Sequence, residues 1–236
     1  MKLTVVDLGL VPYAEAHDLQ LRLALARREG RISDTLLMLE HPPTITVSRN
    51  ADPSHIVETD EELKERGVAR VETDRGGDVT YHGPGQLVGY PILDLSAAPR
   101  RPDLHAYFRQ MEQAIIEALA PFEIAGERFG GYTGVWVLPR AGQPKKIAAM
   151  GIRVSRWITR HGFALNVCPR LDDFAAIVPC GIHDYGVTSM ERLLQRPIAV
   201  AEVAPVVVTC FANEFGAEPQ TISRAELEML LTPALD

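Results

Sequence analysis

The strongest constraint on the fold is the order in which strand-like and helix-like segments follow one another along the 236 residues. Short runs of apolar and β-branched residues predict strands over 3–8, 35–39, 44–47, 68–72, 87–95, 133–138, 146–154 and 162–167. Apolar residues at helical spacing predict helices over 13–28, 61–66, 103–119, 189–194, 200–215 and 223–231. Because the two kinds do not alternate strictly, we expect an α+β fold, a mixed α/β arrangement in which helices pack on a mixed β-sheet.

Charge, hydropathy and cysteine content limit the class of protein. The net charge of −7 argues against a general nucleic-acid binder. No apolar run reaches the length of about 18 residues that a membrane span needs. The three cysteines form no C-x-x-C pair, and their odd number is typical of a reducing compartment. We therefore expect a cytoplasmic protein that binds neither nucleic acid nor a membrane.

Two local signals refine the expected elements. Pro91 interrupts the strand over 87–95, and because proline cannot donate a ladder hydrogen bond, we expect an edge or a bulge at this point. Ser223 and Glu226 have the spacing of a capping box, which predicts the start of the last helix.

Cys180 stands between Pro179 and Gly181, which makes it a candidate nucleophile. Proline fixes its own φ and glycine accepts almost any backbone angle, so this cysteine is expected on a tight loop. Buried structural cysteines usually behave as small apolar side chains. A loop cysteine can instead present its sulfur to a substrate, although a plain turn residue is the alternative interpretation.

The segment from Lys145 to Ile152 begins with two cations and continues with small apolar residues. Along a regular strand, one face carries Ile147, Ala149 and Gly151, and the other carries Lys146, Ala148 and Met150. The small side chains leave room either for a packed helix or for a slender acyl chain with Lys146 or Lys145 beside it. A lysine near a cysteine has a chemical use, because lowering a thiol pKa by about two units takes about 2.7 kcal/mol, which a nearby cation can supply.

The segment from Arg75 to Gln86 is a glycine-rich loop whose backbone N–H groups can approach a ligand closely. It lacks the Gly-Lys-Ser/Thr of a phosphate-binding loop and the glycine spacing of a dinucleotide fingerprint. Arg75, Thr80, Tyr81 and His82 add hydrogen-bond donors and aromatic surface. The alternative is a long hairpin connection without a ligand.

Four segments together resemble the lipoyl/octanoyl transferase family, also called lipoate-protein ligase B. They are Arg75-Gly76-Gly77-Asp78-Val79-Thr80-Tyr81-His82-Gly83-Pro84-Gly85-Gln86, Lys146-Ile147-Ala148-Ala149-Met150-Gly151, His161-Gly162-Phe163-Ala164-Leu165-Asn166-Val167 and Pro179-Cys180-Gly181. The resemblance extends from about residue 35 to about residue 195, in the order typical of the family.

The resemblance implies a biotin/lipoate protein ligase-like catalytic fold in a single domain over 1–236. The core of that domain is expected over roughly 30–218, with a helical C-terminal part over roughly 188–236. It also implies Cys180 as the acyl-thioester nucleophile and Lys146 as its partner. Substrate contacts are implied for Arg75, Gly76, Gly77, Asp78, Val79, Thr80, Tyr81, His82, Ala149, Met150, Gly151, Gly162, Phe163 and Ala164.

The same resemblance implies the reaction and the partners. An octanoyl group, or another medium-chain acyl group, would pass from acyl carrier protein to Cys180 and then to a lysine of a lipoyl domain, in lipoate biosynthesis and protein lipoylation. The acceptors would be lipoyl domains of 2-oxoacid dehydrogenase complexes and the glycine cleavage H protein. Because an amide forms from a thioester, no nucleotide or other cofactor is expected, and no residue set shows metal-ligand spacing.

Three other functions stay open from the sequence. A ligase of the same fold would activate a free acid with ATP and would not need Cys180. A cysteine hydrolase would release the acyl group to water, and a non-catalytic acyl-binding module would form no covalent adduct. Loss of activity in Cys180→Ser distinguishes the transferase from the ligase. Labelling of the acceptor distinguishes it from the hydrolase, and a covalent acyl adduct distinguishes it from the binding module.

The other cysteines, two histidines and a basic stretch give further expectations. Cys168 and Cys210 are expected to be structural, and His41 is interpreted as a pocket wall or a turn residue. His183 lies close to Cys180 in the sequence and is a weaker partner for it than Lys146. The stretch 140–160 has no acidic residue and predicts a basic face for an acidic carrier protein, formed by Arg140, Lys145, Lys146, Arg153, Arg156 and Arg160.

Overall fold

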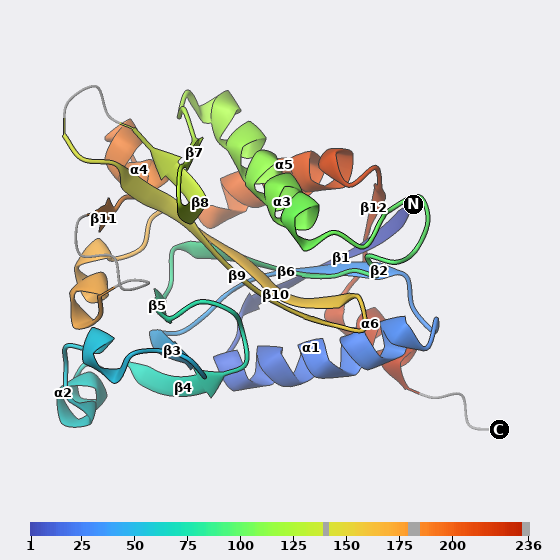
Figure 1. Cartoon of the computed structure of the whole chain (residues 1–236), viewed down its shortest axis with the longest axis horizontal. Helices are drawn as coiled ribbons and strands as arrows, with labels where there is room; N and C mark the ends of the chain where they lie inside the picture. Colours follow the sequence, from blue (N-terminus) through green and yellow to red (C-terminus); the bar gives the residue numbers. More distant parts are fainter. Residues whose placement is uncertain (139–141, 179–184, 233–236) are drawn as a thin grey trace.

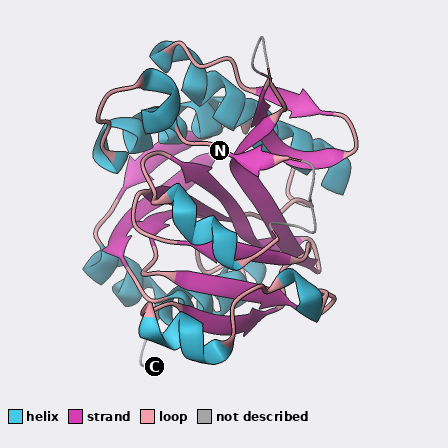
Figure 2. Ribbon diagram, turned by 90° about the vertical axis from the view of Figure 1, so that its left-hand side faces the viewer, coloured by secondary structure: helices cyan, strands magenta, loops and turns pink. Residues whose placement is uncertain are grey.

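The computed structural model describes residues 1–138, 142–178 and 185–232. Within these ranges the chain forms a large mixed sheet, a small three-stranded sheet and helices on both faces of the large sheet (Figure 1). The turned view shows the strands between helical layers (Figure 2). This arrangement confirms the predicted mixed sheet with packed helices.

In the described part of the chain, the large sheet has the strand order β12-β1-β2-β6-β10-β9-β8-β7, and β11 pairs with β9. Its strands are β1 (Lys2–Leu10), β2 (Asp34–Glu40), β6 (Gln86–Ile92), β7 (Glu127–Phe129), β8 (Tyr132–Val137), β9 (Lys145–Ser155), β10 (Ile158–Asn166), β11 (Gly186–Val187) and β12 (Glu218–Thr221). The pairs of β1 with β2 and β12 and the pair of β11 with β9 are parallel, whereas the other neighbours are antiparallel.

The small sheet has the order β4-β3-β5 and packs on short helices. It contains β3 (Thr44–Ser48), β4 (Ala69–Thr73) and β5 (Val79–His82), with η1 (Pro53–His55), α2 (Asp60–Glu65) and η3 (Leu171–Ala176) beside it. Its own apolar cluster joins Ile45, Val79 and Tyr81 with Leu63 of α2 and Phe174 of η3. The small sheet is therefore a separately packed wall that faces the large sheet.

Two helical layers cover the large sheet (Figure 1). One layer contains α3 (Leu104–Leu119), η2 (Ala120–Phe122), α4 (Met190–Leu194) and α5 (Val200–Glu214), and the other contains α1 (Tyr13–Arg28) and α6 (Arg224–Leu231). Residues of β2 alternate between the layers, because Leu36 packs with α3 and α5 while Leu37 packs with α1. No helix of the described residues is both long and apolar enough to cross a membrane.

The C-terminal part contains one strand that the sequence analysis did not predict. Ser223 caps α6 as expected, since its hydroxyl accepts from the Glu226 N–H and the Glu226 carboxylate accepts from the Ser223 N–H. Before this helix, β12 pairs with β1 in parallel register. The whole of β12 is exposed and includes Pro219, so it carries neither an apolar alternation nor a continuous apolar run.

The position of Pro91 corrects one prediction. Strand β6 lies in the middle of the large sheet, between β2 and β10, so Pro91 is not on an edge strand. The ladder between β6 and β10 ends at Gly89 and Phe163. Beyond that point the Pro91 carbonyl accepts a hydrogen bond from the Thr159 hydroxyl at 2.7 Å. The proline is tolerated in a central strand because the ladder has already opened on the side that its nitrogen faces.

Gly89 makes a testable contribution to this sheet. A Cβ at position 89 would lie 2.1 Å from a ring carbon of Phe163, whereas a Cβ at Gly130 would meet nothing within 4 Å. We expect Gly89→Ala to lower the free energy of unfolding by about 2 kcal/mol, because the buried ring must leave its position. Gly130→Ala is the control and is expected to change it by less than about 0.5 kcal/mol. Equal urea midpoints for both variants would contradict this packing argument.

Candidate functional site

A cavity of about 440 Å³ collects most of the residues that the sequence analysis singled out. The predicted residues on its wall are Arg75, Gly77, Asp78, Thr80, His82, Lys146, Ala149, Met150, Gly151, Gly162, Phe163 and Ala164. They come from the loop before β5, from β5 itself and from the hairpin of β9 and β10. Three segments that are far apart in the sequence therefore meet at one cavity.

Three predicted contact residues do not line this cavity. Val79 and Tyr81 alternate with Thr80 along β5, so they point into the core of the small sheet. There the Tyr81 hydroxyl donates to Asp173 at 2.9 Å. The Gly76 N–H donates to the Ile152 carbonyl at 2.8 Å, which ties the loop to β9. Their positions fit a structural contribution better than substrate contact.

Arg75 holds the glycine-rich loop against β3. The residue is 9% exposed, and its guanidinium donates to the hydroxyl and carbonyl oxygens of Thr46 and to the carbonyl oxygens of Gly76 and Asp78, at 2.7 to 3.1 Å. A buried cation needs such partners because its desolvation is expensive. The guanidinium therefore fixes the backbone of the loop and places positive charge on the cavity wall.

A β-bulge in β9 sets the direction of Lys146 and corrects the predicted alternation. Ala148 lies opposite Val135 and Lys146 lies opposite Trp136, so Ile147 is an extra residue on β9. Ile147 and Ala148 are consequently both buried in the core, whereas Lys146 and Ala149 both line the cavity. The prediction that Lys146 and Ala149 face opposite sides was wrong, because a regular period of two does not hold across a bulge.

Lys146 is a largely buried cation. The residue is 7% exposed, and its Nζ atom lies 4.9 Å from the centre of the Trp136 ring. The backbone of Lys146 pairs with Val187 of β11, and its carbonyl accepts from the Thr188 N–H at 3.0 Å. Lys145 is partly exposed and pairs with Gly186.

Cys180 and His183 lie outside the described residues. The described residues on either side of that segment are anchored beside the cavity. The Val178 N–H donates to the His55 carbonyl at 2.8 Å, and the His55 ring contacts the carboxylate of Asp78 on the cavity wall. On the other side Val187 pairs with Lys146.

The sequence analysis missed several residues of the cavity wall. Tyr13, Tyr90 and His161 form a polar side of the cavity, and Gly131, Tyr132 and Thr133 approach it from the hairpin of β7 and β8. The sequence indicates Tyr13 only as a helix residue, because a helical pattern does not indicate which polar residue faces a ligand. His161 belongs to one of the motif segments, and this position is the sequence signal that could have indicated its place at the cavity.

His161 has an unusual backbone for a strand residue. Its φ is 58°, in the left-handed region that non-glycine residues rarely adopt. Its N–H donates to the Gln20 side chain of α1 at 2.7 Å. Such residues are retained where the surrounding structure over-determines them, often at functional sites.

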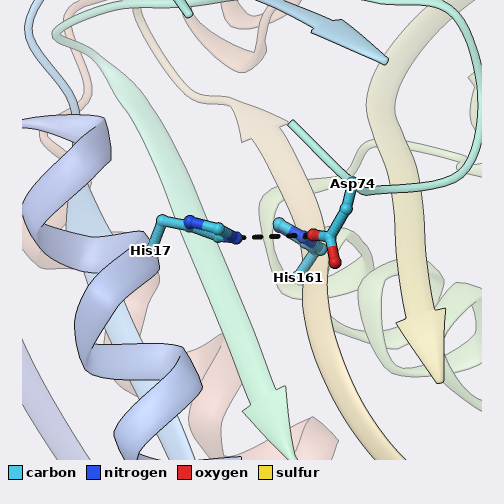
Figure 3. Close-up of side chains that lie close together, drawn as sticks. All are labelled: His17, Asp74 and His161. Carbon is cyan, nitrogen blue, oxygen red and sulfur yellow. Dashed lines mark hydrogen bonds and ion pairs between the residues drawn. The ribbon is translucent and has the colours of Figure 1, made fainter. Parts of the chain in front are cut away.

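Beside the cavity, His17, Asp74 and His161 lie together (Figure 3). Their potential ligand atoms are within 4.8 Å of one another, but Arg160 also bonds to Asp74 at 2.6 Å and approaches His17. A metal ion would face that guanidinium, so the geometry favours an ion-paired hydrogen-bond cluster. Burial opposes ionisation of Asp74, but the bonds from His161 and Arg160 outweigh it and hold its pKa well below the usual range.

Three histidines around the cavity are held neutral. Burial lowers the pKa of His161 to about 4 and that of His41 to about 4. Burial, with repulsion from His41 and Arg75, lowers the pKa of His82 to about 3. His41 does not line the cavity: its ring lies between the Val11 carbonyl and the Tyr90 hydroxyl, each at 2.7 Å.

Two of the predicted glycines on the cavity wall allow neighbouring backbone to approach closely. A Cβ at Gly151 would lie 2.9 Å from the Gly76 carbonyl oxygen, and one at Gly162 would lie 2.2 Å from the Gly89 carbonyl oxygen. Ala164 both lines the cavity and belongs to the apolar core under α1. Of the small residues between Lys145 and Ile152, Ala149 and Gly151 line the cavity and Ala148 packs in the core cluster with α3 and α5, so both interpretations of this segment apply.

The predicted basic face is only partly formed. Lys146 and Arg160 are buried, and Arg160 is paired with Asp74. Arg153 and Arg156 are exposed and Lys145 is partly exposed, while Arg140 lies outside the described residues.

Cys168 and Cys210 are both partly buried, and burial raises the pKa of each thiol.

The chain is similar to known enzymes in sequence. Residues 12–212 match the family described as the lipoyl protein ligase A/B catalytic domain. An octanoyltransferase of Chloroflexus aggregans is 49% identical over 218 residues, which cover 92% of this chain and 96% of the relative. An octanoyltransferase of Rubrobacter xylanophilus is 49% identical over 210 residues, which cover 88% of this chain and 91% of the relative.

Solved structures share the fold at lower sequence identity. A bipartite lipoate protein ligase of Thermoplasma acidophilum matches with a TM-score of 0.74 and 18% identity, over 98% of this chain and 91% of its own. A biotin protein ligase of Aquifex aeolicus matches with a TM-score of 0.50 and 15% identity, over 91% of this chain and 69% of its own. The predicted biotin/lipoate protein ligase-like fold is confirmed.

The neutral histidines predict that mild acid destabilises the fold. Their folded pKa values lie below the unfolded value of about 6.5, so as pH falls below 6.5 the unfolded chain binds protons that the folded chain does not. Between pH 7.5 and 5.5 each histidine is expected to remove up to about 1.4 kcal/mol of unfolding free energy. Urea titrations of the wild type and His82→Gln measure this loss. Because one of the three histidines is absent, the unfolding free energy that His82→Gln loses between these pH values should be about a third smaller than the combined loss from the three histidines. An equal loss in both proteins would contradict the assignment of a lowered pKa to His82.

Proposed function

Since the chain belongs to the octanoyltransferase family, within the lipoyl protein ligase A/B catalytic domains, we propose that it moves an octanoyl group through a thioester on Cys180. The donor is octanoyl-acyl carrier protein and the acceptor is a lysine of a lipoyl domain. The observation that carries the proposal is the buried Lys146 ammonium on the wall of a cavity that glycine and alanine residues help to line.

The reaction has two balanced steps. The Cys180 thiolate attacks the thioester carbonyl of the donor, and the carbon–sulfur bond to the carrier breaks, so the carrier leaves as a thiolate that takes up a proton. The amine of the acceptor lysine then attacks the Cys180 thioester. An amide bond forms, the Cys180 carbon–sulfur bond breaks, and the amine proton leaves through a base.

Lys146 supplies both charge and base in this scheme. Before acylation its ammonium stabilises the thiolate, which a free thiol with a pKa near 8.5 forms only in small part at neutral pH. Acylation removes the anion and leaves the ammonium beside an apolar chain. That environment favours the neutral amine, so Lys146 gives a proton to the departing carrier thiolate and then accepts the proton of the incoming lysine.

The ends of the segment that carries Cys180 support this pairing. Val187, seven positions after Cys180 in the sequence, pairs with Lys146 itself. Val178, two positions before it, is bonded to His55, whose ring contacts Asp78 of the cavity wall. The described ends of the segment are thus bonded to Lys146 of the cavity wall and, through His55, to Asp78 of the same wall, which supports the proposed pairing.

The cavity suits a medium acyl chain. Its volume of about 440 Å³ lies within the range of small-molecule sites.

The acceptors expected for the reaction are lipoyl domains of 2-oxoacid dehydrogenase complexes and the glycine cleavage H protein. Arg153, Arg156 and Lys145 remain as the cations that can steer an acidic carrier protein toward the hairpin of β9 and β10.

The ATP-dependent ligase is the second candidate, because a lipoate-protein ligase A bound with ATP shares the fold with a TM-score of 0.72. That match has 18% identity and speaks only for the fold, whereas the relatives at 49% identity are octanoyltransferases. Dependence on Cys180 separates the two activities.

Cys180→Ser tests the covalent step. We expect the wild type to gain the mass of one octanoyl group on the peptide that contains Cys180 after incubation with octanoyl-acyl carrier protein. The Ser variant should show no thioester and should lose at least about 10³-fold in transfer rate, because a serine hydroxyl is a far weaker nucleophile without a matched base. Cys168→Ser is the control and should retain activity. Full transfer by Cys180→Ser would favour the ligase, and free octanoate without labelled acceptor would favour the hydrolase.

Lys146→Arg tests the second role of the lysine. Arginine keeps the cation but does not lose its proton in proteins, so thiolate formation is preserved while the base is removed. We expect acylation of Cys180 to continue and transfer to the acceptor to fall about 10²-fold or more. Lys145→Arg, the adjacent change, should transfer at the wild-type rate. A wild-type transfer rate in Lys146→Arg would overturn the base assignment.

A further inference from the structure

Four aromatic side chains pack together beside β9, and one of them, Trp136, contacts Lys146. Phe129, Tyr132, Trp136 and Tyr185 are referred to below as the aromatic box. Every pair of rings within the box is in contact, with ring centres 5.1 to 5.8 Å apart. Trp136 is the innermost member and is only 1% exposed, while the other three rings are partly buried. The Lys146 Nζ atom lies 4.9 Å from the centre of the Trp136 ring.

We propose that Trp136 is a positioning residue for the transfer reaction, in which the face of its ring stabilises the charged form of Lys146 on the cavity wall. The inference rests on the proposed function of Lys146 as the partner of Cys180. A cation within about 6 Å of an indole centre is attracted by the ring quadrupole, and the attraction grows when both groups are desolvated. Lys146 and Trp136 are both buried, so they meet this condition.

The backbone explains why the two groups face each other. Lys146 lies opposite Trp136 because the bulge at Ile147 shifts the register of β8 and β9 by one residue. Without this shift, the residue opposite Trp136 would be Ile147, and the cation would turn away from the cavity. The bulge therefore sets both the cavity position of Lys146 and its contact with the indole.

The indole nitrogen supports a role for the ring face. Among the described residues, the Trp136 Nε1 atom is buried without a hydrogen-bond partner. Buried donors usually have partners, so the contacts among the described residues give this N–H group no hydrogen-bonding role. Phenylalanine supplies a ring face without the unpartnered donor, which makes Trp136→Phe an informative conservative change.

The box also fixes the chain that enters β11. Tyr185 packs against the other three rings and immediately precedes Gly186, which pairs with Lys145. A change at Trp136 can therefore act through packing as well as through charge. The experiment must separate these two effects.

Alkylation of Cys180 by iodoacetamide near pH 7, followed by mass spectrometry of the Cys180 peptide, measures the thiolate directly. We expect Trp136→Leu to react about tenfold more slowly than the wild type, because the ammonium that stabilises the thiolate is weakened. Trp136→Phe should remain within about twofold, since it retains a ring face. Phe211→Leu removes a buried ring of α5 in the core cluster, and it should alkylate as the wild type does despite lower stability.

Fluorinated tryptophan distinguishes charge from packing even where Trp136→Leu does not fold. The chain has two tryptophans, so a Trp157→Phe background places the analogue only at 136. Successive fluorines withdraw charge from the ring face with little change in shape. A stepwise fall in Cys180 alkylation and an equal fall in acyl-enzyme formation are expected. If the Cys180 alkylation rate does not change with the number of fluorines, or if folded Trp136→Leu alkylates at the wild-type rate, the proposed role of Trp136 is wrong.

The two hypotheses fail in different ways. If the wild type forms no acyl-enzyme on Cys180, the proposed function fails, whatever the fluorinated proteins do. If the acyl-enzyme forms and Lys146→Gln slows alkylation but fluorination does not, only the inference about Trp136 fails.

Discussion

The β-bulge at Ile147 is the constraint on which the site depends. Strand β9 must provide apolar side chains to the core and a cation to the cavity within a few residues. A regular strand would place Lys146 and Ala148 on one face. The extra residue places Ile147 and Ala148 in the core and leaves Lys146 on the same side as Ala149. The chemistry proposed for Lys146 thus begins with a backbone irregularity, and its contact with Trp136 follows from the same register.

Buried charges connect the two sheets across the cavity. Arg75, which precedes β5, bonds to Thr46 of β3, and Asp74 bonds to His161 and Arg160 of β10. A buried ion is tolerated only with such partners, so the loop between β4 and β5 cannot move away without exposing unpaired charge. The cavity consequently has a rigid wall on the side of the small sheet. That rigidity preserves the space opened by the glycine and alanine residues of β9 and β10.

The sequence predicted those elements of the fold that depend on the periodicity and chemistry of neighbouring residues. The helix over Tyr13–Arg28 and the capping box at Ser223 agree with the structure because both depend on nearby residues. Strand β12 was missed because its pairing with β1 depends on residues more than 200 positions away rather than on an apolar pattern. The sequence predicts an edge or a bulge at Pro91 because it does not reveal where a neighbouring ladder opens, whereas Pro91 lies in a central strand.

The same division applies to the site. The motif segments predicted most of the cavity wall, because glycine-rich and small-residue stretches carry a local signal. Tyr13 was missed because a position on a helix does not reveal the tertiary neighbour of a side chain. The orientation of Lys146 was wrong because a bulge breaks the period of two on which the prediction relied.

The neutral histidines explain why the proton transfer is assigned to the lysine. Histidine is the usual base near neutral pH, and His82 and His161 both line the cavity. Burial lowers their pKa values to about 3 and about 4, so they are weak bases there and add no positive charge beside an acyl chain. Among the described residues that line the cavity, Arg75 and Lys146 are then the cations, and arginine retains its proton. Among the described cations of the cavity wall, Lys146 is therefore the one to which we assign both the charge and the base of the proposed reaction.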